Sequence, residues 1–295
     1  MPGQKHIMPA FTLNFDKFCL ELGSQTCIMG ILNATPDSFS DGGKFNTFET
    51  AVKQGLKLVE DGAHILDIGG ESSRPFATPV SEQEELDRVI PVIENLSKQI
   101  NIPISIDTVK SRVAKEALNA GAAIINDISA FEKDPAMAKL AAKKNVPVIL
   151  MHMKGTPETM QLNPDYDNLM FEITDYLHSR AAYAIKQGIK KKKIILDPGI
   201  GFGKTVEHNL VLIKHLEKIT ELGFPVLMGP SRKSFIQNIL TQKNRAQVGP
   251  DNIKTEYGTM AAVAASLING AHIVRVHDVA SIKPFTHIID SIRNA

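Results

Sequence analysis

Side chains that can bind or react follow a series of short apolar runs along this sequence. Carboxylates, amides, hydroxyls and basic groups all occur at these positions. They are Asn33, Glu71, Ser72, Ser73, Arg74, Pro75, Asp107, Asn126, Asp127, His152, Asp197, Ser231, Arg232, Lys233, Arg275 and His277. Any one of them has an ordinary explanation as a helix cap or a turn former. Their recurrence after one run and the next favours a single shared site.

Four of these residues suit a flat heterocyclic ligand. Asp107 and Asp197 offer acceptor carboxylates, while the Asn126 amide both donates and accepts. Lys233 adds a cationic donor, so a ring with amino, N–H and carbonyl groups would find a partner for each edge atom. A role of the two aspartates as metal ligands is the alternative. It is disfavoured because the third and sixth runs would lie opposite each other in a closed sheet of eight strands.

A second set suits an anionic leaving group. Arg74, Arg275 and His277 are basic side chains that can hold such a group together with a hard divalent cation. Asn33 offers such a cation an oxygen ligand without adding charge. These types indicate a clamp for a phosphate-like group.

Two phosphate-loop motifs fail in the glycine-bearing segment that contains Gly199, Gly201 and Gly203. Its end resembles a Walker A motif, but Pro198 stands where the first glycine is required. A GxGxxG fingerprint fails as well, because Lys204 occupies the last glycine position. We therefore interpret the segment as a loop that lets the backbone approach closely.

The apolar runs themselves predict the strands of a parallel sheet. Continuous apolar runs are typical of strands that are buried on both faces. The eight runs are Cys27–Asn33, His64–Gly69, Pro103–Asp107, Ala122–Asp127, Pro147–His152, Ile194–Pro198, Pro225–Gly229 and His272–His277. Their alternation with helical patterns favours an α/β fold, a closed (β/α)8 barrel of the TIM type, over an open doubly wound sheet. In such barrels the active site lies at the C-terminal ends of the strands, where the reactive side chains stand.

Helix signals lie between the runs. Ser81 to Glu84 match a capping box, and Pro91 should kink or restart the helix that follows. We expect two apolar helix faces, one made by Leu86, Ile90 and Ile93 and the other by Val206, Leu210 and Ile213.

Three further segments lie outside this pattern. Phe11 to Leu22 alternates loosely, which predicts an N-terminal β-hairpin that closes the barrel bottom. Lys190 to Lys193 is expected to be a solvated charge run, and Thr241 to Thr255 a long surface excursion. No linker appears, so we expect one domain over residues 1–295, with 1–26 as its hairpin extension.

Composition excludes several classes of protein. The 33 Lys and Arg against 32 Asp and Glu leave a net charge of +1, so no global field favours nucleic acid or an anionic membrane. The two cysteines, Cys19 and Cys27, have no zinc or redox spacing, and are expected to be ordinary thiols in a reducing compartment. Met1 to Ala10 lacks the apolar stretch of a secretory signal, and no apolar run approaches a membrane span. We expect a cytoplasmic protein.

Ordered motifs from about Cys27 to the end of the chain resemble those of the dihydropteroate synthases. The first, Met29 to Gly43 (MGILNATPDSFSDGG), is long enough to be highly specific. The others are Asp67 to Pro75 (DIGGESSRP), Ser105 to Thr108 (SIDT), Ile125 to Asp127 (IND), Leu150 to Met153 (LMHM), Asp197 to Lys204 (DPGIGFGK), Gly229 to Ser234 (GPSRKS) and Arg275 to Asp278 (RVHD). The resemblance implies a transferase that joins 4-aminobenzoate to a pterin diphosphate in folate biosynthesis.

The resemblance also implies residue roles. Asp107, Asn126, Asp197 and Lys233 would hold the pterin, and Arg275 would stack over its ring while helping to bind phosphate. Asn33 would bind Mg2+, and Arg74 and His277 would contact the diphosphate. The residues implied to frame the aminobenzoate are Ser73, Pro75, Gly201, Phe202, Ser231 and Lys233, with Met151 as a further substrate contact. Family members are generally homodimers, and sulfonamides are the implied inhibitors.

Two departures and a mechanism follow from the resemblance. Ser73 stands where the family commonly has Thr, and Phe76 where it commonly has Gly, which bears on the mouth of the aminobenzoate site. In the expected mechanism, Asp107 and Asp197 stabilise positive charge on the pterin as diphosphate leaves. The loops Asp37 to Phe45 and Gly69 to Thr78 are expected to exclude water.

Two other functions compete with this interpretation. A methyltetrahydrofolate:corrinoid methyltransferase shares the pterin-holding Asp and Asn but needs no diphosphate clamp. A catalytically silent pterin-binding paralogue would have lost a clamp or pterin residue, and none is lost in this sequence.

Overall fold

Parallel strands arranged in a ring form the frame of the protein. The computed structural model describes residues 9–35, 44–72, 78–157, 159–244 and 246–295. The ring strands are β3 (Cys27–Asn33), β4 (Ile65–Gly69), β5 (Ile104–Asp107), β6 (Ile124–Asp127), β7 (Val148–Met151), β8 (Ile194–Asp197), β9 (Leu227–Met228) and β10 (Ile273–Val276). Hydrogen bonds join them in the order β8-β7-β6-β5-β4-β3-β10-β9, and a parallel bridge between Leu196 and Val226 brings β8 to β9. The predicted (β/α)8 barrel is confirmed, and each ring strand lies within one predicted run.

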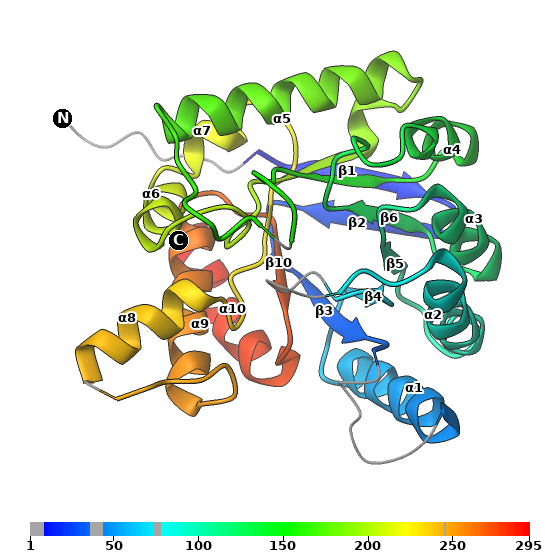
Figure 1. Ribbon diagram of the computed structural model, residues 1–295, viewed down its shortest axis with the longest axis horizontal. Helices are drawn as coiled ribbons and strands as arrows, with labels where there is room; N and C mark the ends of the chain where they lie inside the picture. Colours follow the sequence, from blue (N-terminus) through cyan, green and yellow to red (C-terminus); the bar gives the residue numbers. More distant parts are fainter. Residues whose placement is uncertain (1–8, 36–43, 73–77, 158, 245) are drawn as a thin grey trace.

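Helices surround this ring (Figure 1). They are α1 (Lys44–Glu60), α2 (Glu82–Leu96), α3 (Ser111–Ala120), α4 (Ala136–Lys144), α5 (Leu169–Lys186), α6 (Val206–Lys214), α7 (Glu217–Thr220), α8 (Ser234–Asn244), α9 (Ile253–Ile268) and α10 (Val279–Asn294), with a 3-10 turn at Lys191–Lys193. Apolar faces of the helices and the outward faces of the strands form the larger hydrophobic core. This core fixes the strand ends that carry the polar residues.

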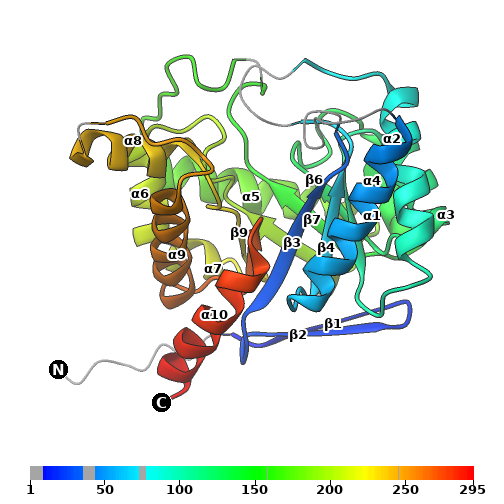
Figure 2. The ribbon, with the colours of Figure 1, turned by 90° about the horizontal axis from the view of Figure 1, so that it is seen from below.

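The N-terminal hairpin covers one end of the barrel. β1 (Phe11–Phe15) and β2 (Phe18–Leu22) pair in antiparallel register. Leu13 and Leu22 pack into the barrel interior against residues near the strand beginnings, such as Ile65. Figure 2 shows the hairpin across the end from which β3 points away. The predicted closure of the barrel bottom is confirmed, and the opposite end is left for a site.

Helix α2 departs from its prediction at two points. The Ser81 side chain accepts a hydrogen bond from the Glu84 backbone N at 3.2 Å. Glu84 pairs with Arg88 instead of reaching back, so only half of the capping box forms. The helix continues through Pro91 without a restart. We attribute this continuity to the buried face that includes Val89 and Val92, because packing offsets one lost backbone hydrogen bond.

The buried face of α6 differs from the predicted one. Leu210 is 46% exposed, while Asn209, Leu212 and Ile213 are buried. The Asn209 amide accepts from the Gly201 backbone N and donates to the Thr205 carbonyl. These polar contacts turn the helix away from the face that hydrophobic spacing alone predicts.

Two polar stretches are more ordered than expected. Lys193 is buried and donates to the Asn145 carbonyl, whereas the preceding lysines of the charge run are exposed. The excursion predicted over Thr241 to Thr255 is shorter, because α8 reaches Asn244 and α9 begins at Ile253. The first stretch therefore contains a buried lysine, and the second is shorter because helices form at both of its ends.

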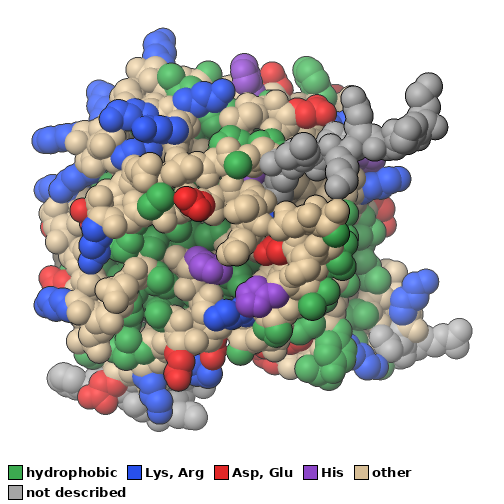
Figure 3. All heavy atoms as spheres, turned by 180° about the vertical axis from the view of Figure 1, so that it is seen from behind, with side chains coloured by type: hydrophobic (Ala, Val, Ile, Leu, Met, Phe, Trp, Pro, Cys, Tyr) green, Lys and Arg blue, Asp and Glu red, His purple; other side chains and the backbone are tan. Residues whose placement is uncertain are grey.

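The surface carries charges of both signs. In Figure 3, Lys and Arg side chains gather at one edge of the visible face, and acidic side chains are scattered over the rest. Within the described ranges of the chain, no helix combines the length and apolarity that crossing a bilayer requires.

Candidate functional site

A partly buried guanidinium connects two carboxylates inside the barrel. Arg275 donates from Nε to Asp67 Oδ2 at 2.6 Å and from Nη2 to Asp107 Oδ2 at 2.8 Å. Asn126 Nδ2 also donates to Asp67 Oδ2, at 3.2 Å. These side chains come from β10, β4, β5 and β6, and meet because strand residues two apart share a face. The ring thus brings together residues up to 208 positions apart in sequence.

Burial shifts the protonation of this cluster. Desolvation raises the pKa of Asp107 to about 7, although the Arg275 charge acts to lower it and the Asp67 charge raises it further. Burial alone would lower the pKa of Arg275, but Asp67 and Asp107 outweigh it and raise that pKa. Among the described residues, Asp67 Oδ1 has no hydrogen-bond partner. The site therefore contains a carboxyl group whose raised pKa lies near neutral pH, beside a permanent cation.

Asp197 faces the same interior from the end of β8. Its Oδ1 accepts from the Gly199 backbone N at 2.7 Å. Burial raises the pKa of Asp197 to about 6, against that hydrogen bond and the nearby charges of Lys233, Lys204 and Arg275. The charges of Asp107 and Asp197 both act on Arg275, so the two acids lie near one guanidinium. The described residues contain no cluster of three His, Cys, Asp or Glu side chains that could hold a metal ion.

The loop after β8 supplies an aromatic ring and a close backbone approach. Lys233 Nζ lies 3.9 Å from the centre of the Phe202 ring, a cation–π contact. Gly201 has φ of +82°, and a Cβ there would stand 2.9 Å from Lys233 Cδ. Gln161 Nε2 donates to the Gly201 carbonyl at 2.6 Å. Phe202 and Lys233, far apart in sequence, therefore form one wall.

Ser231 and His277 form a second polar pair at the same end of the barrel. The Ser231 hydroxyl lies 2.9 Å from His277 Nδ1, and the His277 backbone N donates to the same oxygen at 3.3 Å. Ser231 is 4% exposed. The contact with Ser231 holds the His277 imidazole, which the sequence analysis expects to bind an anionic leaving group, in one orientation.

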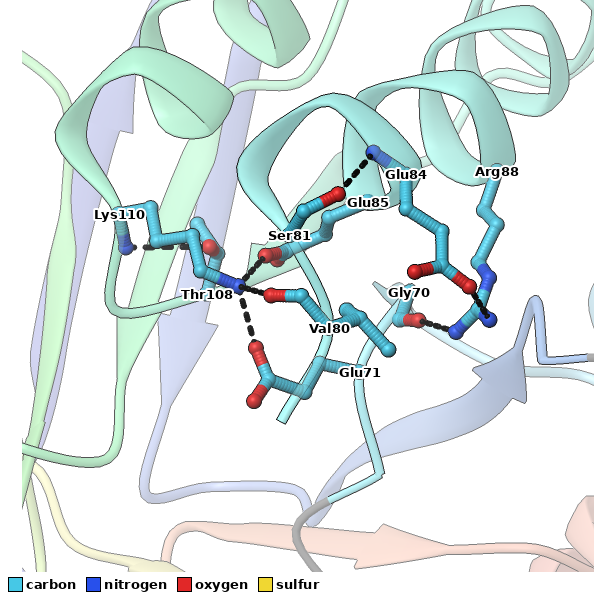
Figure 4. Close-up of polar contacts among 9 residues, drawn as sticks. All are labelled: Gly70, Glu71, Val80, Ser81, Glu84, Glu85, Arg88, Thr108 and Lys110. Atoms are coloured by element: carbon cyan, nitrogen blue, oxygen red, sulfur yellow. Dashed lines mark hydrogen bonds and ion pairs between the residues drawn. The ribbon is translucent and has the colours of Figure 1, made fainter. Parts of the chain in front are cut away.

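An ion cluster centred on Lys110 borders a cavity that Asp107 also lines, and Figure 4 shows the contacts of this cluster. Lys110 Nζ donates to Glu71 Oε2 at 2.5 Å, to Glu85 Oε2 at 2.6 Å and to the Val80 carbonyl at 3.0 Å. Glu71 and Val80 lie near the two ends of the connection between β4 and α2, so one ammonium joins both ends. The cavity has a volume of about 280 Å³, and its lining includes Glu71, Glu85, Asp107, Lys110, Ile128 and Met153.

Not every predicted site residue can be placed. Ser73, Arg74 and Pro75 lie outside the described residues, as do Phe76 and most of the two loops expected to exclude water. Asn33 ends β3 and is half-buried, and Met151 ends β7 and packs beside Phe202.

One of the polar residues at the strand ends is a turn former and not a site residue. Asp127 accepts from Ser129 N and Oγ and from Phe131 N, so it forms the turn after β6. It is absent from the Arg275 cluster.

Sequence reasoning missed Asp67 as a site residue. Asp67 opens the DIGGESSRP motif but was assigned no role of its own. It is fully buried and contacts both Arg275 and Asn126. The available signal was a carboxylate in the middle of the apolar run His64–Gly69, because unpaired charges are rarely fully buried.

Comparison with known proteins agrees with this geometry. The family model described as pterin binding enzyme matches residues 29–277. A dihydropteroate synthase of Synechocystis is 47% identical over 270 residues, which cover 92% of this chain and 91% of that protein.

Solved structures give the same result. A Yersinia pestis dihydropteroate synthase in complex with a sulfonamide drug is similar with a TM-score of 0.89 and 41% identity, covering 97% of this chain and 100% of that one. The Xanthomonas albilineans dihydropteroate synthase in complex with 7,8-dihydropteroate has a TM-score of 0.81 and 40% identity, covering 92% and 95%. The chain therefore belongs to the pterin-binding enzyme family and, within it, to the dihydropteroate synthases.

Proposed function

We propose that this protein condenses 6-hydroxymethyl-7,8-dihydropterin diphosphate with 4-aminobenzoate, giving 7,8-dihydropteroate and diphosphate in folate biosynthesis. The observation that carries the proposal is the pair of acids near Arg275, the partly buried Asp107 and the buried Asp197, both with raised pKa values. Donors and acceptors of this kind match the edge of a pterin. The protein is a transferase like its relatives.

The pterin occupies the interior end of the site. Asp107, Asn126, Asp197 and Lys233 hold its polar edge, and Arg275 stacks over the ring. Support comes from the common origin of these side chains at strand ends and from the Asp67 contact, which anchors Arg275 from within. Such an anchored guanidinium needs little reorganisation when the ligand binds.

The aminobenzoate lies nearer the solvent. Phe202 and Lys233 offer a flat apolar surface with a charge above it, and the absence of a Cβ at Gly201 leaves room for the Lys233 side chain beside it. The further proposed contacts are Ser73, Pro75, Met151 and Ser231. The Lys233 ammonium is suited to the carboxylate or to the aromatic face, depending on the depth of the ring.

Asn33 is the proposed protein ligand of Mg2+, and Arg74, Arg275 and His277 contact the diphosphate. The fit rests on chemistry: Asn33 is a half-buried oxygen donor at the C-terminal end of β3, and Mg2+ commonly takes few protein ligands and several phosphate oxygens. When bound, the ion neutralises charge that develops on the departing diphosphate.

The reaction breaks the bond between the pterin methylene carbon and a diphosphate oxygen and forms a bond from that carbon to the aniline nitrogen. The nitrogen then loses a proton. Positive charge builds on the pterin in the transition state, and ionised Asp107 and Asp197 stabilise it, since both are largely removed from solvent, where charge interactions are strong. We place the protein in the cytoplasm as a homodimer, the state expected of this family.

The test measures diphosphate release by the purified protein with pterin diphosphate and Mg2+, with and without 4-aminobenzoate. Release that depends on 4-aminobenzoate, with 7,8-dihydropteroate as product, is the expected result. An Asp107→Asn variant, purified identically, controls for contaminating phosphatases. No release with both substrates present would overturn the proposal and favour a silent pterin-binding paralogue.

A further inference from the structure

Two glycines hold the loop after β8 close to the neighbouring β7 loop. Gly199 has φ of +69°, and a Cβ there would stand 2.0 Å from the His152 carbonyl oxygen. Gly203 has φ of +64°, and its Cβ would stand 2.3 Å from the Lys154 carbonyl oxygen. The two loops therefore touch through backbone, and side chains must fix how they lie against each other.

Lys204 lies buried beneath this contact. It is 2% exposed, and its Nζ donates to the Phe202 carbonyl at 2.9 Å. The same nitrogen lies 3.0 Å from His152 Nδ1 and 3.5 Å from the His152 carbonyl. The ammonium thus joins the residue that carries the aromatic wall to the end of β7. None of these contacts is with a residue assigned to the pterin.

The electrostatics agree with such a structural use of the charge. Burial lowers the pKa of Lys204 to about 7, although the Asp197 charge acts to raise it. Burial, with the Lys204 charge second, lowers the pKa of His152 to about 2. The imidazole is therefore neutral, and its Nδ1 can accept from Lys204. The His152 ring is held in turn by an edge contact with Tyr176, with centroids 4.9 Å apart.

We propose that Lys204 is a positioning residue: by donating to the Phe202 carbonyl and to His152, it holds the segment Gly199–Gly203 in the conformation that presents Phe202 to 4-aminobenzoate. This rests on the proposed function. Lys204 does not touch the reacting atoms. It acts through the backbone of the residue whose ring packs under Lys233.

Other side-chain contacts hold the loop at Gly201 and Gly203, and a backbone hydrogen bond from Phe202 N to the Gly199 carbonyl, at 3.0 Å, lies within it. Tyr166 OH donates to the Gly203 carbonyl at 2.8 Å, and Asn209 accepts from Gly201 N at 2.8 Å. Within the described ranges, the side-chain hydrogen bond that reaches the Phe202 backbone comes from Lys204. Its loss should therefore change the presentation of the ring more than the folding of the loop.

The test compares steady-state kinetics of Lys204→Met and the wild type, with each substrate varied in turn. Loss of a buried charge-assisted hydrogen bond should raise the KM for 4-aminobenzoate by about tenfold or more, with a change of less than about threefold in kcat. The matched control is Lys154→Met, an exposed lysine on the adjoining loop, which should keep both values. A folded Lys204→Met with the wild-type KM would overturn the proposal.

A second pair of variants covers the case in which Lys204→Met does not fold. His152→Leu removes the acceptor, whereas His152→Asn keeps an oxygen near the Nδ1 position. We expect His152→Leu to raise the KM for 4-aminobenzoate and His152→Asn to restore it. Equal KM values for the two would overturn the proposal. A wild type that does not condense the substrates would instead refute the proposed function.

Discussion

At the scale of single residues, the site depends on where its charges are buried. Asp107 and Asp197 both sit in the interior, where desolvation raises their pKa values to about 7 and about 6. The charge of Arg275 acts to lower both pKa values. Asp67 accepts a hydrogen bond from Arg275 Nε and so holds the guanidinium in place. The proposed mechanism requires both acids in the ionised form. Protonation should therefore control the rate near neutral pH.

We expect kcat/KM for the pterin diphosphate to fall as the pH is lowered through about 7 and again through about 6, because protonation removes the charges that stabilise the transition state. The sign follows from the raised pKa values: each acid is active above its pKa and inactive below it. Asp107→Asn should lower kcat strongly and remove the upper step. The measurement is a pH–rate profile between about pH 5 and about pH 8.5. A flat wild-type profile would contradict the electrostatic role.

At the scale of elements, the hairpin and the strand ends divide the work of the barrel. The strands' C-terminal ends bear the polar cluster, while β1 and β2 fill the other end with Leu13, Phe15 and Leu22. Each hairpin strand alternates buried and exposed residues, as an antiparallel strand with one packed face should. Stability and chemistry are thus placed at opposite ends.

Leu13→Ala should destabilise the protein by about 2 to 5 kcal/mol, because it leaves a cavity under the fully buried hairpin face. KM values for both substrates should stay within about twofold of wild type, since the change lies at the end of the barrel away from the site. Urea unfolding and steady-state kinetics measure the two effects. Thr12→Ala, on the exposed face of the same strand, is the control. A large KM change in a folded Leu13→Ala would refute this separation.

At the scale of the whole molecule, exposed apolar side chains are unevenly distributed. Helix α9 carries Ile253, Tyr257 and Ile268, which are 60%, 61% and 61% exposed. Such side chains on one helix are typical of an interface between subunits. They make α9 the element through which we expect the homodimer to form.

Tyr257→Glu should therefore shift the protein from dimer to monomer, because it introduces a charge into an apolar contact. Sedimentation velocity at several concentrations measures the shift. Phe171→Glu, at a residue that is 64% exposed on α5, is the matched control and should leave the dimer intact. Figure 1 shows α5 at another edge of the molecule than α9. A wild type that sediments as a monomer throughout would contradict the dimer, and an unchanged Tyr257→Glu dimer would exclude α9.

The sequence by itself determined the eight strands, the order of the elements and the residues at the strand ends. These follow from local signals: apolar runs such as Cys27–Asn33 must be buried on both faces, and the polar residues that end them mark one rim. The hairpin followed from alternation for the same reason. The resemblance of the motifs then implied the roles of these residues. Their chemical types alone left open whether Asp107 and Asp197 bind a heterocyclic ligand or a metal ion.

Only the tertiary structure decided which of these side chains meet. Asp67 reads locally as one residue of a buried strand, yet it binds an arginine 208 positions away. Lys204 is a charged residue at the end of a glycine-bearing loop, a local setting in which exposure to solvent is common. The closed barrel instead buries it against His152. The buried face of α6 differs from the predicted one because the Asn209 side chain accepts a hydrogen bond from the Gly201 backbone N in the loop after β8. The physical reason is shared: such contacts depend on the closure of the barrel, which local spacing along the chain does not encode.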